Sequence, residues 1–363
     1  MYDQIKGNTL YIMLYAAVMT MAVMACCYLL FRKANAIAPD VTPPARLRRW
    51  SAAFFAALAL NHVWYMPLFF LTSSDAVLLA DLIGGLLDTM SVFPLAIMVM
   101  LVMLQDRRRP LWPVIVVLLP VVLAGAWCVV TRSYAVLPVG YVCFVLVSIG
   151  LIIYMIHALR QYGRWLRDNF SDLEHKEVWQ SFVVLAIVLL VFVVYALTNE
   201  NQIFIYVMLA VSAVLICYLL WRVETLSDLS FSQSSINEEA VTTQEQTTHN
   251  DYGPFLQKYC IDTQLYLQHD LTLLQLSKAI GTNRFYLSQY FSSQGTTYNA
   301  YINNLRVDHF VSLYREALAS QRYITAQQLA QESGFRSYST FCRVIKVKTG
   351  KSVTAWMKDC VRA

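Results

Sequence analysis

The chain contains seven apolar segments, and each is about as long as a lipid bilayer is thick. A helix needs about 20 predominantly apolar residues to cross the hydrocarbon core, and only helices and closed barrels satisfy their backbone polar groups there. The segments lie at residues 9–31, 50–71, 76–104, 111–130, 138–159, 178–197 and 203–221. We therefore expect seven transmembrane helices in a domain that covers residues 1–222. Arg32 and Lys33 follow the first apolar run, which favours a retained helix over a cleaved signal peptide.

The basic residues between these segments alternate from loop to loop. Every second loop is rich in them, and together these loops carry twelve: Arg32, Lys33, Arg46, Arg48, Arg49, Arg107, Arg108, Arg109, Arg160, Arg164, Arg167 and Lys176. The other loops carry only Arg132. Cytoplasmic loops of membrane proteins carry the excess of Lys and Arg. The pattern therefore predicts an N-terminus outside the cell and, after seven crossings, a C-terminal region in the cytoplasm.

The chain changes character after the last apolar segment. As a whole it is 58% hydrophobic and 14% charged, whereas soluble domains are roughly 25% charged. Residues 223–250 are rich in Ser, Thr, Gln, Asn and Glu, which predicts a flexible linker. Residues 251–363 hold 13 Lys and Arg against 7 Asp and Glu, a net charge of +6, and show only helical periodicity. We expect an all-α chain in which a basic soluble domain follows the membrane domain.

The soluble domain contains an internal repeat, in residues 276–302 and 329–357. Seven pairs of positions correspond: Ser277 with Ala330, Gly281 with Gly334, Leu287 with Phe341, Phe291 with Ile345, Gly295 with Gly350, Ala300 with Ala355 and Tyr301 with Trp356. A small residue followed four positions later by Gly is typical of a helix-turn-helix, where two helices cross closely and the turn requires a positive φ. The repeat predicts two such units, joined by a helix at Tyr298 to Ala319. That helix would span about 30 Å, close to the roughly 34 Å between successive major-groove faces of B-DNA.

At this point the C-terminal region resembles a known family. The second unit carries the pattern A-x-x-x-G-F-x-S-x-S-x-F-x-R-x-(F)-K-x-x-x-G as Ala330, Gly334, Phe335, Ser337, Ser339, Phe341, Arg343, Ile345, Lys346 and Gly350. Residues 255–360 are thus similar to the DNA-binding domain of the AraC/XylS family of bacterial transcription regulators. The departures are Ile345 for the usual Phe, Val353 for the usual Pro and Ser277 for the usual Ala of the first unit. The resemblance implies a bacterial origin and gene regulation, and it covers under a third of the chain.

The inward positions of each second helix determine which residues face a groove of DNA. In the first unit the outward residues are Arg284, Phe285, Ser288 and Gln289, and their equivalents in the second are Tyr338, Ser339, Cys342 and Arg343. Arg and Gln can form paired hydrogen bonds with guanine and adenine. Further basic residues of the second unit, better suited to phosphates, are Arg336, Lys346, Lys348 and Lys351. The alternative is that all of these are ordinary solvated residues on helices that bind no DNA.

Within the apolar segments, a small group of polar residues lies far from either end. Asp81 and Asp88 are seven residues apart and so share one face of a helix. By helix rise, Asp88 lies about 18 Å from the outer end of its segment, and Asn61 and His62 lie about 13–15 Å from theirs. Ionisable groups at such depth are costly and usually functional. We expect them to form an outward-facing ligand or proton-sensing site beside Trp64; the alternative is that they only hold helices together.

The sequence favours a membrane-bound one-component transcription regulator that senses a signal through its membrane domain. It contains no phosphate-binding Gly-rich loop, HExxH motif or cysteine–histidine ligand spacing, so we predict no catalytic residues, no metal and no cofactor. Expected partners are double-stranded promoter DNA, a lipid bilayer and a small-molecule or physical signal, and a homodimer remains open. The expected location is the bacterial cytoplasmic membrane. Two other classes stay open: a transporter-like protein with a regulatory domain, which predicts inverted repeats, and a passive anchor, which predicts replaceable Asp and His residues.

Overall fold

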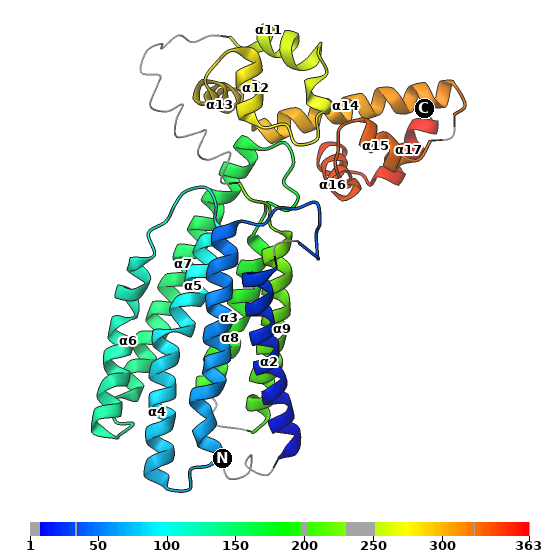
Figure 1. The fold of residues 1–363 in the computed structure, drawn as a ribbon. Coiled ribbons are helices and arrows are strands. Elements are labelled where there is room, and N and C mark those ends of the chain that lie inside the picture. The colour runs from blue at the N-terminus through cyan, green and yellow to red at the C-terminus, as the bar shows by residue number, and fades with distance from the viewer. Residues whose placement is uncertain (1–7, 33–34, 198–201, 230–250, 323, 363) are drawn as a thin grey trace. The chain divides into compact units, whose positions relative to one another are not determined.

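A computed structural model describes residues 8–32, 35–197, 202–229, 251–322 and 324–362 of the chain (Figure 1). All regular secondary structure in these residues is helical, which confirms the predicted all-α class. The chain divides into two compact units. The first comprises Met1–Arg160 and Val178–Ser230, and the second comprises Gln161–Glu177 and Phe231–Ala363.

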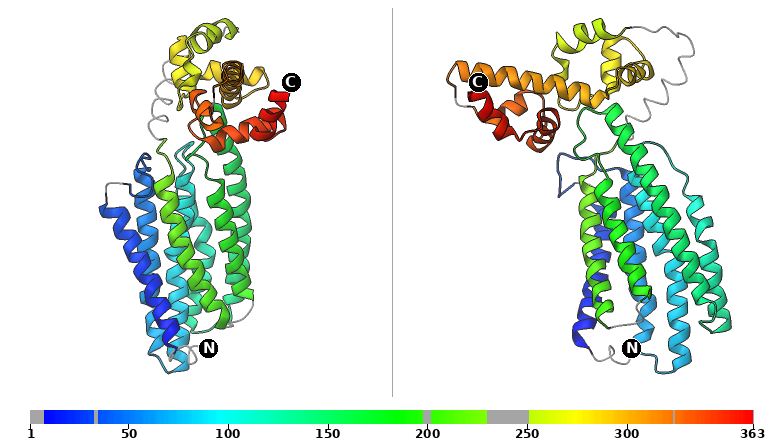
Figure 2. Two further views of the ribbon diagram at one scale, coloured as in Figure 1. Left: turned by 90° about the vertical axis from the view of Figure 1, so that its right-hand side faces the viewer. Right: turned by 180° about the vertical axis from the view of Figure 1, so that it is seen from behind.

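The first unit is a bundle of long apolar helices (Figures 1 and 2). They are α2 (Thr9–Phe31), α3 (Ala45–Tyr65) with the short 3-10 helix η1 (Met66–Phe69), α4 (Ser74–Met90), α5 (Val92–Met103), α6 (Trp112–Thr131), α7 (Leu137–Asn169), α8 (Trp179–Leu197) and α9 (Gln202–Thr225). Six membrane-length apolar spans are shown in the described residues, with α4 and α5 forming one of them. The predicted count of seven is therefore not reached. The difference is α8, whose apolar part Trp179–Val188 is shorter than a bilayer requires.

Large apolar side chains face outward on this bundle. On α6, Ile115, Leu123 and Trp127 are each 60% exposed, and on α7 Leu146 is 63% exposed. Only 17% of the apolar window of each of these two helices is buried. Exposed apolar surface on this scale would be unfavourable in water, and it suits contact with lipid.

Polar contacts gather at one end of the bundle, where two of the basic loops meet the end of α9. The buried Glu224 carboxylate pairs with Arg48 at 3.4 Å, and the Glu224 carbonyl accepts a hydrogen bond from Asn35 at 2.7 Å. Beyond α9, the Leu229 N–H donates to the side chain of Gln105, which in turn donates to the Ser227 carbonyl. The segment that leaves α9 is thus held by both loops. The predicted linker begins in this segment, and its residues 230–250 lie outside the described part of the chain.

Two helices differ from the predicted spans. The third span is broken at Ser91, between α4 and α5. Pro94 explains the break, because it has no N–H to donate and its ring clashes with the carbonyl four residues earlier. The fifth span was expected to end at residue 159, but α7 continues to Asn169. The loop expected at 160–177 is therefore helical over its first half.

The second unit contains the repeated helices. They are α11 (Gly253–Leu256), η2 (Gln257–Ile261), η3 (Leu265–Leu267), α12 (Leu273–Ile280), α13 (Arg284–Ser293), α14 (Tyr298–Ala319), α15 (Ala326–Glu332), α16 (Tyr338–Thr349) and α17 (Val353–Arg362). The first helix of each repeat begins in the same way. Thr272 caps α12 and Thr325 caps α15, each with a Gln three residues later that returns a contact to the cap residue. Such reciprocal caps satisfy two otherwise unpaired backbone N–H groups.

Each repeat has its own hydrophobic core. Leu276, Leu287 and Phe291 belong to the first, and Phe335, Phe341 and Ile345 belong to the second. Helix α14 contributes to both, through Ile302 to the first and through Phe310 to the second. Its bounds are those predicted, and it fixes the separation of the two repeats.

A glycine and an arginine hold the two repeats in contact. Gly334, in the turn of the second repeat, has φ +86°, and a Cβ there would lie 2.7 Å from the Leu267 carbonyl oxygen of the first. Arg306 of α14 is buried beside this contact. Its Nε donates to the Tyr266 carbonyl at 2.8 Å and its Nη2 to the Gln268 carbonyl at 2.6 Å, while its guanidinium lies over the Phe335 ring. One side chain thus links both repeats.

Candidate nucleic-acid interface

Helix α13 is the second helix of the first helix-turn-helix unit, and the second helix of each unit, which carries the residues expected to face DNA, is named here its recognition helix. Helix α13 begins after Asn283, whose side chain accepts a hydrogen bond from the Phe285 N–H. Leu287 and Phe291 are buried, as the sequence predicts. On the other side, Phe285 is 67% exposed and Gln289 is exposed, whereas Arg284 and Ser288 are half-buried. The helix therefore presents an aromatic ring and an amide to the surroundings, with a single basic residue at its start.

Helix α16 is the recognition helix of the second repeat. Ser337 caps it by accepting a hydrogen bond from the Thr340 N–H, and Phe341 and Ile345 are fully buried. The predicted outward residues are exposed along it: Tyr338, Ser339, Arg343, Lys346 and Lys348, with Cys342 half-buried among them. Arg336 precedes the helix and Lys351 follows it, and both are exposed as well. This surface is basic over its whole length.

Four carboxylates approach this basic surface, and three of them come from distant parts of the sequence. Lys348 Nζ lies 2.6 Å from Asp308 and Lys351 Nζ lies 2.6 Å from Asp359. Arg336 lies 3.3 Å from Asp270, and Arg343 lies 3.6 Å from Glu177. Lys346 has no such pair among the described residues. Hydrogen bonding to Asp359 raises the pKa of Lys351. These are exposed pairs, which contribute little to stability and exchange readily for another anion, so the surface remains suited to phosphates.

The polar residues predicted in the bundle are only partly brought together. Asn61 Nδ2 donates to both carboxylate oxygens of Asp88, at 2.7 and 2.9 Å, and Trp64 Nε1 donates to one of them at 3.1 Å. Three of the polar and aromatic residues singled out from the sequence therefore form one cluster between α3 and α4. A carboxylate with this many donors is stabilised in apolar surroundings.

The other two predicted members of that site make different contacts. The buried His62 places Nδ1 2.8 Å from the Leu58 carbonyl of its own helix, and its ring contacts that of Tyr15. His62 therefore does not join the Asp88 cluster, although it follows Asn61 directly, because neighbouring positions on a helix point in different directions. Asp81 accepts a hydrogen bond from the Tyr134 hydroxyl at 3.2 Å. No group of three or more His, Cys, Asp or Glu residues within the described ranges is arranged to hold a metal ion.

Comparison with known proteins agrees with the geometry of the C-terminal repeats. A family model described as a helix-turn-helix domain, of the AraC type, matches residues 276–359. No curated protein and no solved structure matches the chain. The matched region begins in α12 and ends in α17, so it covers both repeats and the helix that joins them. The C-terminal region therefore contains a helix-turn-helix domain of the AraC type, which is a DNA-binding domain.

Proposed function

We propose that this chain is a membrane-bound one-component transcription regulator, in which one polypeptide both receives a signal in the membrane and binds promoter DNA. The observation that carries the proposal is the joining of an AraC-type DNA-binding domain to six membrane-length apolar spans in one chain. A regulator of this design needs no separate kinase or messenger, because the sensing part is covalently attached to the part that binds DNA.

The expected orientation places the DNA-binding domain in the cytoplasm. Twelve Lys and Arg residues lie in alternate loops against one in the others, and cytoplasmic loops carry such an excess. Two of these basic loops and the end of α9 meet at one end of the bundle. Reporter fusions after residues 40 and 108 should then report cytoplasm, and fusions after residues 74 and 200 should report the outside. This orientation requires α8 to cross the membrane in addition to the six spans, and a cytoplasmic signal from the fusion at 200 would contradict it.

The cluster of Asn61, Trp64 and Asp88 is the best-supported place for a signal to act. An anchor for a DNA-binding domain would require only apolar helices, and a carboxylate within the bundle costs stability unless it is paired. Here the carboxylate joins α3 to α4, and the neutral side chains of Asn61 and Trp64 donate hydrogen bonds to it. A ligand or proton that competes for the Asp88 oxygens would loosen this junction, and the two helices would shift against each other.

The experiment that tests the proposal compares two Asp to Asn changes on the same helix. Asp88→Asn removes the charge that Asn61 and Trp64 hold, whereas Asp75→Asn removes an exposed charge from the first turn of α4. DNA occupancy across the genome, target transcripts and protein abundance should be measured together in both variants.

We expect the Asp88 variant to stay in the membrane and on its promoter while its transcript response changes, and the Asp75 variant to behave as the unaltered protein. Normal regulation by both variants would instead favour a passive anchor. Absence of promoter occupancy in the unaltered protein would contradict gene regulation altogether.

A further inference from the structure

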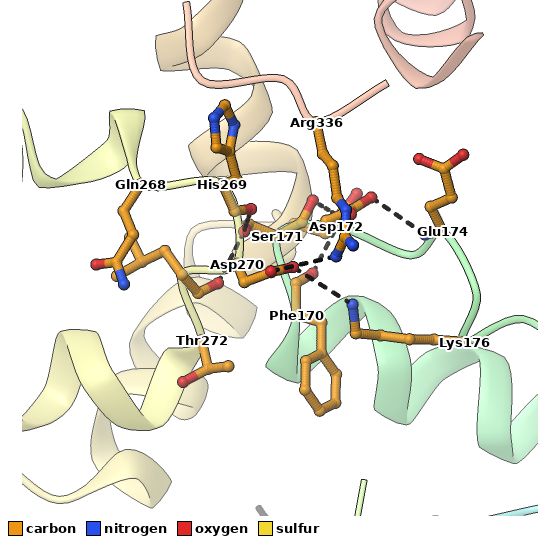
Figure 3. Close-up of polar contacts among 12 residues, drawn as sticks. Phe170, Ser171, Asp172, Glu174, Lys176, Gln268, His269, Asp270, Thr272 and Arg336 are labelled. Atoms are coloured by element: carbon orange, nitrogen blue, oxygen red, sulfur yellow. Dashed lines mark hydrogen bonds and ion pairs between the residues drawn. The ribbon is translucent and has the colours of Figure 1, made fainter. Parts of the chain in front are cut away.

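Residues 161–177, named here the docking strap, pack on the DNA-binding domain within the second unit (Figure 3). Ser171 lies at the centre of the contact and is 1% exposed. Its hydroxyl donates to the Leu271 carbonyl at 2.7 Å, and its own carbonyl accepts from Asn299 at 2.7 Å and from Asn303 at 3.2 Å. The preceding residue, Phe170, forms a single antiparallel bridge with Thr272. Most of these bonds involve main-chain groups, so the strap is recognised by its backbone shape.

The contact between the strap and the DNA-binding domain also includes charged groups. Arg306 donates to Ser171 Oγ at 3.3 Å, in addition to the carbonyls that it holds in the domain. Burial lowers the pKa of Arg306, and the carboxylates of Asp172 in the strap and Asp270 in the domain act against that shift. Lys176 of the strap also pairs with Asp270 at 3.8 Å. Figure 3 shows the ends of Lys176 and Arg336 both reaching Asp270. Charges of both signs are therefore matched across the contact.

Two residues of the strap, Asn169 and Glu177, each hold one arginine of a recognition helix. Asn169 Oδ1 accepts a hydrogen bond from Arg284 at 2.5 Å, and Glu177 lies 3.6 Å from Arg343. Both arginines are among the residues expected to contact DNA. An arginine held in this way must leave its partner before it can bind a base or a phosphate. Gln289 and Lys346, by contrast, have no bond to the strap in the described structure.

The strap is a direct continuation of a helix of the bundle. Helix α7 runs without interruption from Leu137 to Asn169, so its last nine residues belong to the strap. A helix is stiff along its axis, and a shift or rotation of α7 therefore displaces Asn169. The strap thus connects the membrane-length part of one helix to Arg284 without passing through the segment 230–250.

We propose that the docking strap is an intramolecular binding site that competes with DNA for Arg284 and Arg343, and that movement of α7 sets the outcome. This rests on the proposed function, since it requires that the domain binds DNA under control of the bundle. In the docked form the two arginines are held by Asn169 and Glu177. In the released form they are available to the duplex, and each recognition helix gains one basic contact.

The test uses the full chain in lipid nanodiscs and a DNA duplex selected by that chain from a random-sequence pool. Two changes act in opposite directions. Glu177→Gln removes the charge that pairs with Arg343, and we expect duplex binding to tighten by about two- to five-fold, the range expected for an exposed pair. Asn169→Asp places a carboxylate against Arg284, and binding should weaken by a similar factor.

Each change has a control of equal charge within the strap. Glu174→Gln removes a carboxylate that has no ion pair with either arginine in the described structure. Gln161→Glu adds a carboxylate on α7 eight residues before Asn169, about 12 Å away by helix rise. Both controls should bind as the unaltered chain does. Hydrogen exchange supplies a second readout: the Ser171 amide, which donates to the Leu271 carbonyl, should exchange faster when the duplex is bound.

The outcomes separate the two proposals. If the unaltered chain binds the duplex, but the Glu177→Gln and Asn169→Asp variants bind as their controls do and the Ser171 amide keeps its protection, the proposed competition by the strap is overturned and the proposed regulator function is not. Duplex binding by the Glu177→Gln variant but not by the unaltered chain would support the competition. If neither the unaltered chain nor either of these two variants binds duplex DNA, the proposed function is overturned, and the competition with it.

Discussion

The two helix-turn-helix repeats share one framework and differ in what they present to DNA. Both begin with a Thr–Gln reciprocal cap, both bury two apolar residues of the recognition helix, and both use a glycine of positive φ in the turn. Yet α13 carries one basic residue, Arg284, whereas α16 carries Arg343, Lys346 and Lys348. The duplication has therefore kept the positions that determine folding, while the exposed positions have diverged.

This difference indicates that the two repeats have different roles in binding DNA. An aromatic ring and an amide, as on α13, can distinguish base edges, while lysines hold phosphates whatever the sequence. We expect the first repeat to supply most of the sequence preference and the second to supply most of the salt-dependent affinity. The predictions below test first the common framework and then the divergent faces.

The largest effect is expected at the residue that both repeats share. Arg306→Ala would remove the Arg306 donor from the Tyr266 carbonyl and from the Gln268 carbonyl, which keeps only the Leu271 N–H at 3.3 Å. We expect both repeats to lose about 3–5 kcal/mol of stability because buried acceptors would lose their partners. Hydrogen exchange of the full chain should show lower protection in α12 and in α15. Arg315→Ala, at an exposed position of the same helix, is the control. A loss confined to one repeat would show that Arg306 does not join them.

The turn glycines should respond unequally to the same change. Gly281→Ala and Gly334→Ala each force Ala into a positive φ, which costs about 1–2 kcal/mol. At Gly281 nothing lies within 4 Å of the added Cβ, but at Gly334 the Leu267 backbone lies 2.7 Å away. Crowding should add about 1–3 kcal/mol at Gly334. Protection from hydrogen exchange, measured in each repeat, checks this, and equal losses would contradict the close contact.

The sequence predicted the framework because framework positions follow local rules. Spacing identified Leu287 and Phe291 as buried, and placed α14 at Tyr298–Ala319, as the structure has it. Those rules act within a few residues of the chain, where helical periodicity determines which side chains share a face. The need for Gly at 334 was also predicted from its turn, but the close approach of Leu267 was not, since it depends on how two repeats pack.

The contacts made by the residues expected to face DNA were not predictable in the same way. Lys348 meets Asp308 across 40 positions of sequence, and Arg284 meets Asn169 across 115. Charge counts within 336–351 show only basic residues and give no hint of these partners. His62 illustrates the same limit in the bundle: helix rise predicted its depth but not its direction, and its contacts are with Leu58 and Tyr15.

The exposed faces of α13 and α16 should make different contributions to DNA binding, which an assay over many DNA sequences can distinguish. Gln289→Ala in the first repeat should reduce preference by about 1–3 kcal/mol at one base pair if the amide reads that base directly. Arg343→Ala, at the equivalent position of the second repeat, should lower affinity for most sequences with little change in preference. Selection from a random-sequence pool at fixed salt measures both. A larger loss of preference from the Arg343 change would reverse the assigned roles.

The smallest expected difference lies within α16, between two lysines on the same exposed surface. Lys346 has no acidic partner in the described structure, whereas Lys348 lies 2.6 Å from Asp308. A phosphate contact by Lys346 costs no ion pair, so Lys346→Ala should weaken binding to all sequences and reduce the slope of log affinity against log salt by about 1. Lys348→Ala should reduce the slope by less, because DNA must first displace Asp308.

The change Asp308→Asn removes that competition. It should tighten DNA binding when Lys348 is present, and it should have a much smaller effect in a chain that already carries Lys348→Ala. An equal gain from Asp308→Asn in both backgrounds would show that its charge repels DNA generally, and that the pair with Lys348 does not limit binding.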